Sequence, residues 1–192
     1  MNNLNRYDII LASASPRRQE LLKSLDINFR VEIINGIDES YPTYLESDNV
    51  ALYISQKKAK SYQSLITDNQ LVITADTIVV VDSQILGKPK DCEDAKCMLR
   101  ALSGRTHKVI TGVAITTADK EVAFDAVTIV EFAELTDDEI EYYVTRYNPA
   151  DKAGSYGIQE WIGAIGVKSI SGSYYNVMGL PLHRLYTELR GF

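Results

Sequence analysis

The sequence is poor in cysteine and histidine and contains no long hydrophobic run. Its two cysteines, Cys92 and Cys97, lie in a segment with a helical pattern at a spacing that suits neither a disulfide framework nor a four-ligand zinc site. The two histidines, His107 and His183, have no serine or cysteine arrangement beside them, so we expect packing or surface roles. The longest apolar runs, such as IVVV at 78–81, are far too short to cross a bilayer.

Positive charge is also scarce. The chain has 20 lysines and arginines against 26 aspartates and glutamates, and its formal net charge is -6. This balance excludes a general attraction to nucleic acid or to an anionic membrane, so any phosphate binding has to come from a local cluster. The N-terminus lacks the order of basic, apolar and small residues that is typical of a signal peptide, and we therefore expect a cytoplasmic protein with free thiols.

The chain does have the material for a well-packed core. Its 192 residues, of which 45% are hydrophobic, predict one domain over 1–192 or two small lobes that share a core. Strand patterns rich in Val, Ile and Thr alternate with helical patterns, which indicates an α/β fold, and a turn signal at Asp119 predicts a mixed sheet. The expected strands span 7–11, 29–34, 71–74 continuing into 78–81, 108–116, 122–132 and 162–170. The expected helices span 16–25, 48–65, 93–102, 137–147 and 181–189, the fourth opened by a capping box and the fifth by a proline in its first position.

The stretch SASPRR, residues 13–18, contains an electrostatic conflict. Ser15 suits a helix N-cap and Pro16 suits the first helical position. Arg17 and Arg18 then fall where the helix dipole favours acidic residues by about 0.3–1 kcal/mol. A bound anion would remove the conflict, because backbone N–H groups, serine hydroxyls and guanidinium groups together bind phosphate oxygens. The alternative is that both arginines point to solvent.

Carboxylates occur in two segments where a catalytic or metal-binding role is one possible interpretation. Asp76 lies between apolar runs in LVITADTIVVV, where an ionised carboxylate needs a partner or a metal ion. It could cap a strand end or accept backbone N–H groups, or it could serve as a general base or a ligand of a hard divalent cation. Asp38 and Glu39 follow a glycine in the loop NGIDESYP.

Lysines recur in two further segments. Lys57, Lys58 and Lys60 lie on an expected helix, where a run of charge usually forms a solvated face, and we expect this of Lys57 and Lys60. Lys88 precedes a proline, which favours an extended backbone and a fixed presentation of its side chain. Together with the arginines, serines and carboxylates, these lysines suggest a polyphosphate site in which the acidic groups hold Mg²⁺.

Taken in order, these segments resemble the Maf family of nucleotide pyrophosphatases. The matching motifs are LASASPRRQELL, GIDE, KKA, ADTIV, LGKPKD, LSGRTHKVITGVA, DKAGSYGIQ and ISGSYYNVMGLPL, and they run from near residue 9 to near residue 182. The resemblance implies an inosine triphosphatase-like α/β fold, with a mixed twisted sheet and flanking helices in two lobes around a cleft. It also implies a homodimer that hydrolyses nucleoside triphosphates to the monophosphate and pyrophosphate.

The resemblance further implies a role for particular residues. Glu39 and Asp76 would coordinate a divalent metal, Mg²⁺ or Mn²⁺, and Asp76 would accept the proton of the attacking water. The residues implied to contact the phosphates are Ser13, Arg17, Arg18, Lys58 and Lys88, and those implied in the choice of base are Thr77 and Gln159 together with Arg17. The runs SPRRQ and YGIQ resemble the branch that acts on dTTP and UTP.

The sequence departs from the family pattern at one place, and two alternative functions are open. Glu160 and Trp161 stand where relatives often have glycine or small residues, which would alter the base preference if that segment lines the base pocket. We expect Trp161 to be a core or dimer residue instead. The alternative functions are a nucleotide-binding regulator linked to cell division that does not hydrolyse its ligand, and a pyrophosphatase for non-standard purine triphosphates.

Overall fold

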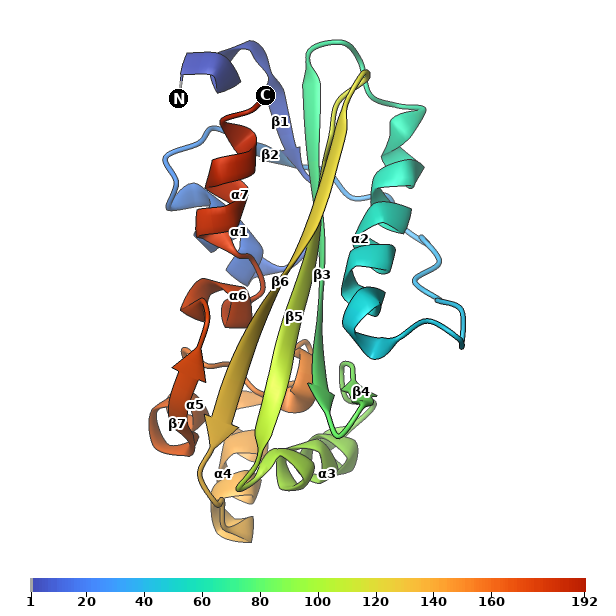
Figure 1. The fold of residues 1–192 in the computed structure, drawn as a ribbon. Helices are drawn as coiled ribbons and strands as arrows, with labels where there is room; N and C mark the ends of the chain where they lie inside the picture. The colour runs from blue at the N-terminus through green and yellow to red at the C-terminus, as the bar shows by residue number, and fades with distance from the viewer. Residues whose placement is uncertain (1) are drawn as a thin grey trace. The chain divides into compact units, whose positions relative to one another are not determined.

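The computed structural model describes the backbone of residues 2–192 and the side chains of residues 4–192. It has a mixed seven-stranded sheet in the order β2-β1-β3-β5-β6-β7, with β4 paired to β3 (Figure 1). Strand β1 is parallel to both β2 and β3, whereas β4 is antiparallel to β3 and β7 is antiparallel to β6. The strands are β1 (Asp8–Leu11), β2 (Arg30–Val31), β3 (Gln70–Val81), β4 (Gln84–Leu86), β5 (Thr106–Thr116), β6 (Glu121–Phe132) and β7 (Val167–Ser171). The mixed α/β sheet predicted from the sequence is confirmed.

Seven α-helices and two short 3-10 helices accompany the sheet in the described residues. The α-helices are α1 (Pro16–Lys23), α2 (Ser47–Gln63), α3 (Cys92–Leu102), α4 (Asp137–Tyr147), α5 (Trp161–Gly166), α6 (Tyr174–Met178) and α7 (Leu182–Leu189); the 3-10 helices are η1 (Asn2–Arg6) and η2 (Ala153–Ser155). No helix in the described part of the chain is both long and apolar enough to cross a membrane.

The chain divides into two compact units. Unit 1 comprises the residues up to Asp76, Thr111–Ala126 and Gly179–Phe192, and unit 2 comprises Thr77–Ile110 and Val127–Met178. Three of the four divisions fall inside β3, β5 and β6, so each of these long strands supplies residues to both units, and the fourth falls between α6 and α7.

In unit 1, α2 fixes the conformation of the chain that leaves β2. The ring of Tyr62 is buried in a cluster with Ile10 and Val72, which are paired partners in β1 and β3. Its hydroxyl donates to the Glu32 carbonyl at 2.9 Å and accepts from the Ile34 amide at 3.0 Å. These backbone groups are thereby bonded to a side chain, which explains why β2 ends at Val31 although the sequence predicts a strand to residue 34.

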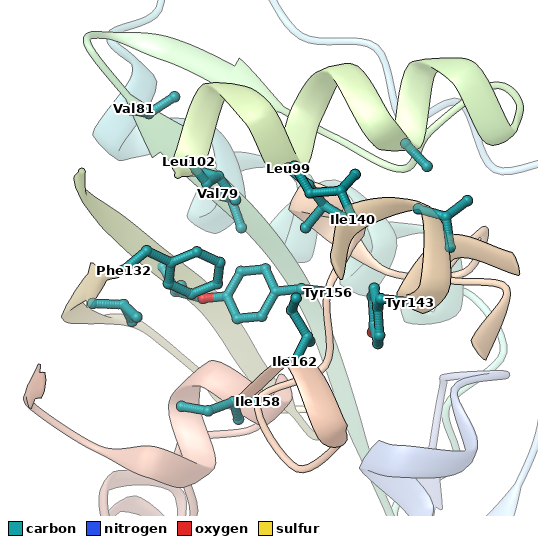
Figure 2. Packing of buried hydrophobic residues seen from close by; sticks show 14 residues of the cluster. Val79, Val81, Leu99, Leu102, Phe132, Ile140, Tyr143, Tyr156, Ile158 and Ile162 are labelled. Carbon is teal, nitrogen blue, oxygen red and sulfur yellow. The ribbon is translucent and has the colours of Figure 1, made fainter. Parts of the chain in front are cut away.

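Unit 2 is built around a larger apolar cluster to which α3, α4 and α5 all contribute (Figure 2). The fully buried side chains of Leu99, Tyr143 and Ile162 come from these three helices. Helix α4 begins with the predicted capping box, in which Thr136 accepts from the Glu139 amide while the Glu139 carboxylate accepts from the Thr136 amide. The capping box therefore stabilises the first turn of α4, and burial of one face holds the helix against the core.

The expected strand over 162–170 is wrong in its first half. Residues Trp161–Gly166 form α5, and β7 covers only Val167–Ser171. A Cβ atom at residue 163 would lie 1.9 Å from the Ile158 carbonyl oxygen, so this close helical turn requires glycine. The Ile and Val content of the segment favours a strand and does not indicate this turn.

Three expectations about helix starts also change in detail. Ser15 is the N-cap of α1, but its side chain makes no capping hydrogen bond. Ser47 is the first residue of α2, with Glu46 at the N-cap, and Pro181 is the N-cap of α7 rather than its first residue. The last two are shifts of one residue, and all three helices are present as predicted.

Candidate active site

The N-terminal end of α1 is organised by the buried Ser13. Its hydroxyl oxygen accepts from the Ser15 amide and from Arg18 Nη1, each at 3.3 Å. Both acceptor positions of the oxygen are thus used, and its hydrogen donates to no other described residue. Ser13 is therefore able to donate this hydrogen to an oxygen atom placed at the end of the helix.

Arg18 turns back into unit 1 and does not project from it. Its Nε donates to the Gly179 carbonyl and its Nη1 donates to the Ala75 carbonyl, both at 2.8 Å. Burial lowers the pKa of the guanidinium, and the negative charge of Asp76 opposes that shift. Arg18 thereby ties α1 to the residue before Asp76, so the solvent-facing alternative is wrong for this arginine.

Asp76, the carboxylate that lies among apolar residues in the sequence, is paired with Lys58 of α2. Lys58 Nζ lies 2.8 Å from Asp76 Oδ1 and 3.0 Å from Glu39 Oε1. The side chains of Lys58 and Asp76 are each 14% exposed, whereas that of Glu39 is 57% exposed. The ammonium group thus joins the two carboxylates predicted to hold a metal, although they are far apart in the sequence.

The preceding lysine, Lys57, fastens the loop that carries Glu39. Its Nζ donates to Asp38 Oδ2 at 2.7 Å and to the Ser40 carbonyl at 2.9 Å, and these acceptors flank Glu39 on both sides. Asp38 in turn accepts from the Ser40 amide at 2.9 Å, which closes a local turn. The Lys57 and Ser40 hydrogen bonds hold the pKa of Asp38 well below its usual range. The expectation of a merely solvated Lys57 is therefore wrong.

The donor set fits a hard divalent cation that shares its coordination with a ligand. Asp76 and Glu39 are the two carboxylates that meet at Lys58, and no group of three or more His, Cys, Asp or Glu side chains suited to a metal occurs in the described residues. Mg²⁺ is commonly bound through one or two carboxylates, with water and phosphate oxygens completing its coordination. These two residues therefore suit a metal that binds together with a phosphate chain.

The remaining predicted residues belong to unit 2. Thr77 is partly buried in β3, Lys88 is exposed between β4 and α3, and Gln159 is exposed just before α5. Unit 1 thus holds six of the nine predicted site residues, Ser13, Arg17, Arg18, Glu39, Lys58 and Asp76, and unit 2 holds the other three.

Comparisons with known proteins identify the family to which this chain belongs. The sequence matches the family described as Maf-like protein over residues 8–192, and the chain belongs to that family. A dTTP/UTP pyrophosphatase of Phocaeicola vulgatus is 56% identical over 190 residues, which are 99% of this chain and 98% of that protein. A dTTP/UTP pyrophosphatase of Parabacteroides distasonis is 54% identical over 192 residues and all of both chains.

A solved structure supports the fold independently of close sequence similarity. The Ham1 protein of Staphylococcus aureus superposes with a TM-score of 0.54 at 16% sequence identity, and the match covers 96% of this chain and 98% of that one. At this identity the likeness shows a shared fold, and it confirms the inosine triphosphatase-like fold class that the family resemblance predicts.

Sequence reasoning missed several residues that shape these segments. Lys57 lies in a run of lysines, and no sequence pattern indicates which of them pairs with Asp38. Lys152 lies seven residues before Gln159 and is 7% exposed, yet as a single charged residue in a loop it gave no signal of burial. Tyr143 looked like one core aromatic among twelve tyrosines.

Proposed function

We propose that this chain hydrolyses dTTP and UTP to the nucleoside monophosphate and pyrophosphate with the help of a divalent metal. The observation that carries the proposal is the convergence of Asp76 and Glu39 on Lys58, in the same unit as Ser13 and Arg18. Carboxylates for a metal, cations for phosphates and a serine donor are the groups that a triphosphate requires. Relatives with more than 50% identity over nearly the whole chain are named dTTP/UTP pyrophosphatases, which supports the same substrates here.

In the proposed reaction, water attacks the α-phosphorus and pyrophosphate leaves. Asp76 accepts the proton of the water, and its position mid-strand with 14% exposure fixes the orientation of the carboxylate. Glu39 and Asp76 hold Mg²⁺ or Mn²⁺, which when bound supplies neutralisation of phosphate charge and a more acidic water. Lys58, Arg17 and Arg18 offset the charge that develops on the phosphate oxygens.

Ser13 has a defined part in this scheme. Its hydroxyl oxygen is fixed by two hydrogen-bond donors, so the hydrogen is directed away from them toward an incoming oxygen. The fixed orientation means that little conformational entropy is lost when a phosphate oxygen is bound. Ser13 thus acts as a positioned donor for the phosphate chain.

The residues of unit 2 receive their roles from the family pattern alone. Lys88 is assigned to the phosphates, and Thr77 and Gln159 are assigned with Arg17 to the base. A carboxamide presents an acceptor and a donor side by side, which suits the amide edge of uracil and thymine. We further propose on the same basis that residues 1–192 act as one functional domain, that the protein forms a homodimer and that it is cytoplasmic.

The test is a panel of canonical and modified triphosphates incubated with Mg²⁺, followed by identification of the products. The proposal predicts monophosphate and pyrophosphate from dTTP and UTP, and complete loss of both products when the metal is chelated. Binding without turnover would favour the regulatory alternative. Faster turnover of non-standard purine triphosphates would favour the third function. Release of inorganic phosphate in place of pyrophosphate would contradict attack at the α-phosphorus.

A further inference from the structure

A buried ion pair lies immediately beside Gln159. Lys152 Nζ is 3.2 Å from Glu160 Oε1 and 2.9 Å from Asp151 Oδ1. The side chains of Lys152 and Glu160 are 9% and 20% exposed. Buried pairs gain little net stability because desolvation of the two charges offsets their attraction, so a conformational role is the better explanation of this one.

Glu160 is also fastened to the apolar core of unit 2 through Tyr143. The Tyr143 hydroxyl donates to Glu160 Oε2 and accepts from the Gly157 amide at 3.0 Å. Tyr143 is fully buried in the cluster of Figure 2, and burial together with Glu160 raises the pKa of its hydroxyl, which stays protonated as a donor. The Tyr143 hydroxyl thus binds the backbone of Gly157 and the side chain of Glu160, and these two bonds restrain both ends of the segment 157–160 that contains Gln159.

The Gln159 side-chain nitrogen and the Glu160 carboxylate both lie close to the Cβ side of Gly157. A methyl group on the Gly157 Cα would be 3.1 Å from Gln159 Nε2 and 3.0 Å from Glu160 Oε2. A carboxylate attracts the amide hydrogens and repels the amide oxygen, so the charge of Glu160 favours the rotamer with Nε2 on its side. The Gln159 Oε1 atom is then the one turned away from Glu160.

We propose that Glu160 is a specificity-determining positioning residue, which sets the orientation of the Gln159 carboxamide and thereby selects uracil and thymine against cytosine. This inference rests on the proposed function, in which Gln159 contacts the base. Uracil and thymine present an N3–H donor, which an outward Oε1 accepts, whereas cytosine presents an acceptor at N3. With the amide reversed, Nε2 would instead donate to cytosine.

The test compares Glu160→Gln with the wild type, because this change removes the charge and keeps the shape. The measurement is kcat/KM for dTTP and for dCTP. We expect the ratio of the two to fall about tenfold through a higher KM for dTTP, with kcat for dTTP nearly unchanged. The matched control is Glu141→Gln, which removes one of the two exposed partners of Lys96 in the same unit and should leave the ratio unchanged.

A second variant separates orientation from folding. Lys152→Gln combined with Glu160→Gln removes both charges of the pair, so no buried lysine is left that has lost one of its two carboxylate partners. We expect stability to recover relative to Glu160→Gln while the dTTP to dCTP ratio stays low. A ratio that returns to the wild-type value together with stability would show a merely structural role and overturn the inference.

The outcomes also distinguish the inference from the function on which it rests. If the wild type hydrolyses neither dTTP nor UTP, the proposed function fails. If the wild type hydrolyses them and Gln159→Ala lowers the ratio while Glu160→Gln does not, the function stands and the role of Glu160 is refuted.

Discussion

Lys58 and Asp76 form an ion pair of 2.8 Å in which each side chain is 14% exposed. The pair explains how an ionised carboxylate is accommodated in the middle of β3, among apolar neighbours. Lys58 also reaches Glu39 at 3.0 Å, so a single lysine connects the centre of a strand with a loop that ends more than thirty residues earlier in the chain. Removal of Lys58 would deprive Asp76 of this ion pair, whereas removal of Asp76 would leave Lys58 paired with Glu39.

Arg18 is expected to be more sensitive to substitution than Arg17. Arg18→Lys loses the fork that reaches the Gly179 and Ala75 carbonyls together, so unfolding free energy should fall by about 1–3 kcal/mol and KM for dTTP should rise. Arg17→Ala should raise KM with a smaller loss of stability. Urea unfolding and initial-rate kinetics measure the two effects, and an unchanged KM in both variants would remove the arginines from the phosphate site.

The contacts of Lys57 predict an effect on metal affinity. Lys57→Met frees the residues on both sides of Glu39, and the Mg²⁺ concentration for half-maximal rate should rise about tenfold, with kcat at saturating metal little changed. Lys57→Arg should restore part of the affinity. The control is Lys60→Met, which changes an exposed lysine of the same helix. Equal metal dependence of the Lys57 and Lys60 variants would show that this loop needs no such anchor.

His107 predicts a stability that depends on pH. The imidazole is 2% exposed, its Nε2 is 2.8 Å from the Tyr156 hydroxyl, and burial lowers its pKa from 6.5 to about 4. The unfolded state therefore binds more protons between these values. The contribution of His107 is fully present above pH 6.5 and is lost as the pH falls toward 4, by up to about 3 kcal/mol.

The measurement for His107 is the free energy of unfolding of the wild type minus that of His107→Gln across this range. The difference should shrink steadily from pH 6.5 to pH 4. His183→Gln, at an exposed position, serves as the control. A constant difference for His107→Gln would mean that folding does not lower the pKa of this ring.

Gly112 marks a close approach between β5 and α2. An added Cβ would lie 2.4 Å from backbone atoms of Ala51, which cannot move as the end of a side chain can. Gly112→Ala should therefore cost about 1–3 kcal/mol or more of unfolding free energy through overpacking. Gly87→Ala meets nothing within 4 Å and should change the melting temperature little. Similar melting temperatures for the two variants would refute the tight contact.

The sequence predicted the elements whose signals are local. Hydrophobic pattern and caps placed α1, α2, α3, α4 and all the long strands to within a few residues. The start of α4 was predicted because Thr136 and Glu139 satisfy each other's backbone groups within one turn. The α5 segment was missed because its shape depends on contact between Gly163 and Ile158, which composition does not encode.

The candidate site was predictable in its residues but not in its connections. Asp76 and Arg18 were conspicuous because each breaks a local rule for charge. Their partners are distant in the chain: Lys58 pairs with Asp76, and the carbonyl of Gly179 accepts from Arg18. Such pairings follow from tertiary packing, so sequence reasoning without the fold could name the charges and not the contacts that satisfy them.

The most direct measurement is pyrophosphate release from dTTP by the wild type and by Asp76→Asn, at saturating Mg²⁺ and with circular dichroism to verify folding. Asparagine keeps the shape of the side chain and loses its charge, so it can neither accept the proton of water nor hold the metal in the same way. The account predicts an active wild type and a folded variant with turnover reduced about a thousandfold or more. A folded variant with activity within a few-fold of the wild type would contradict it.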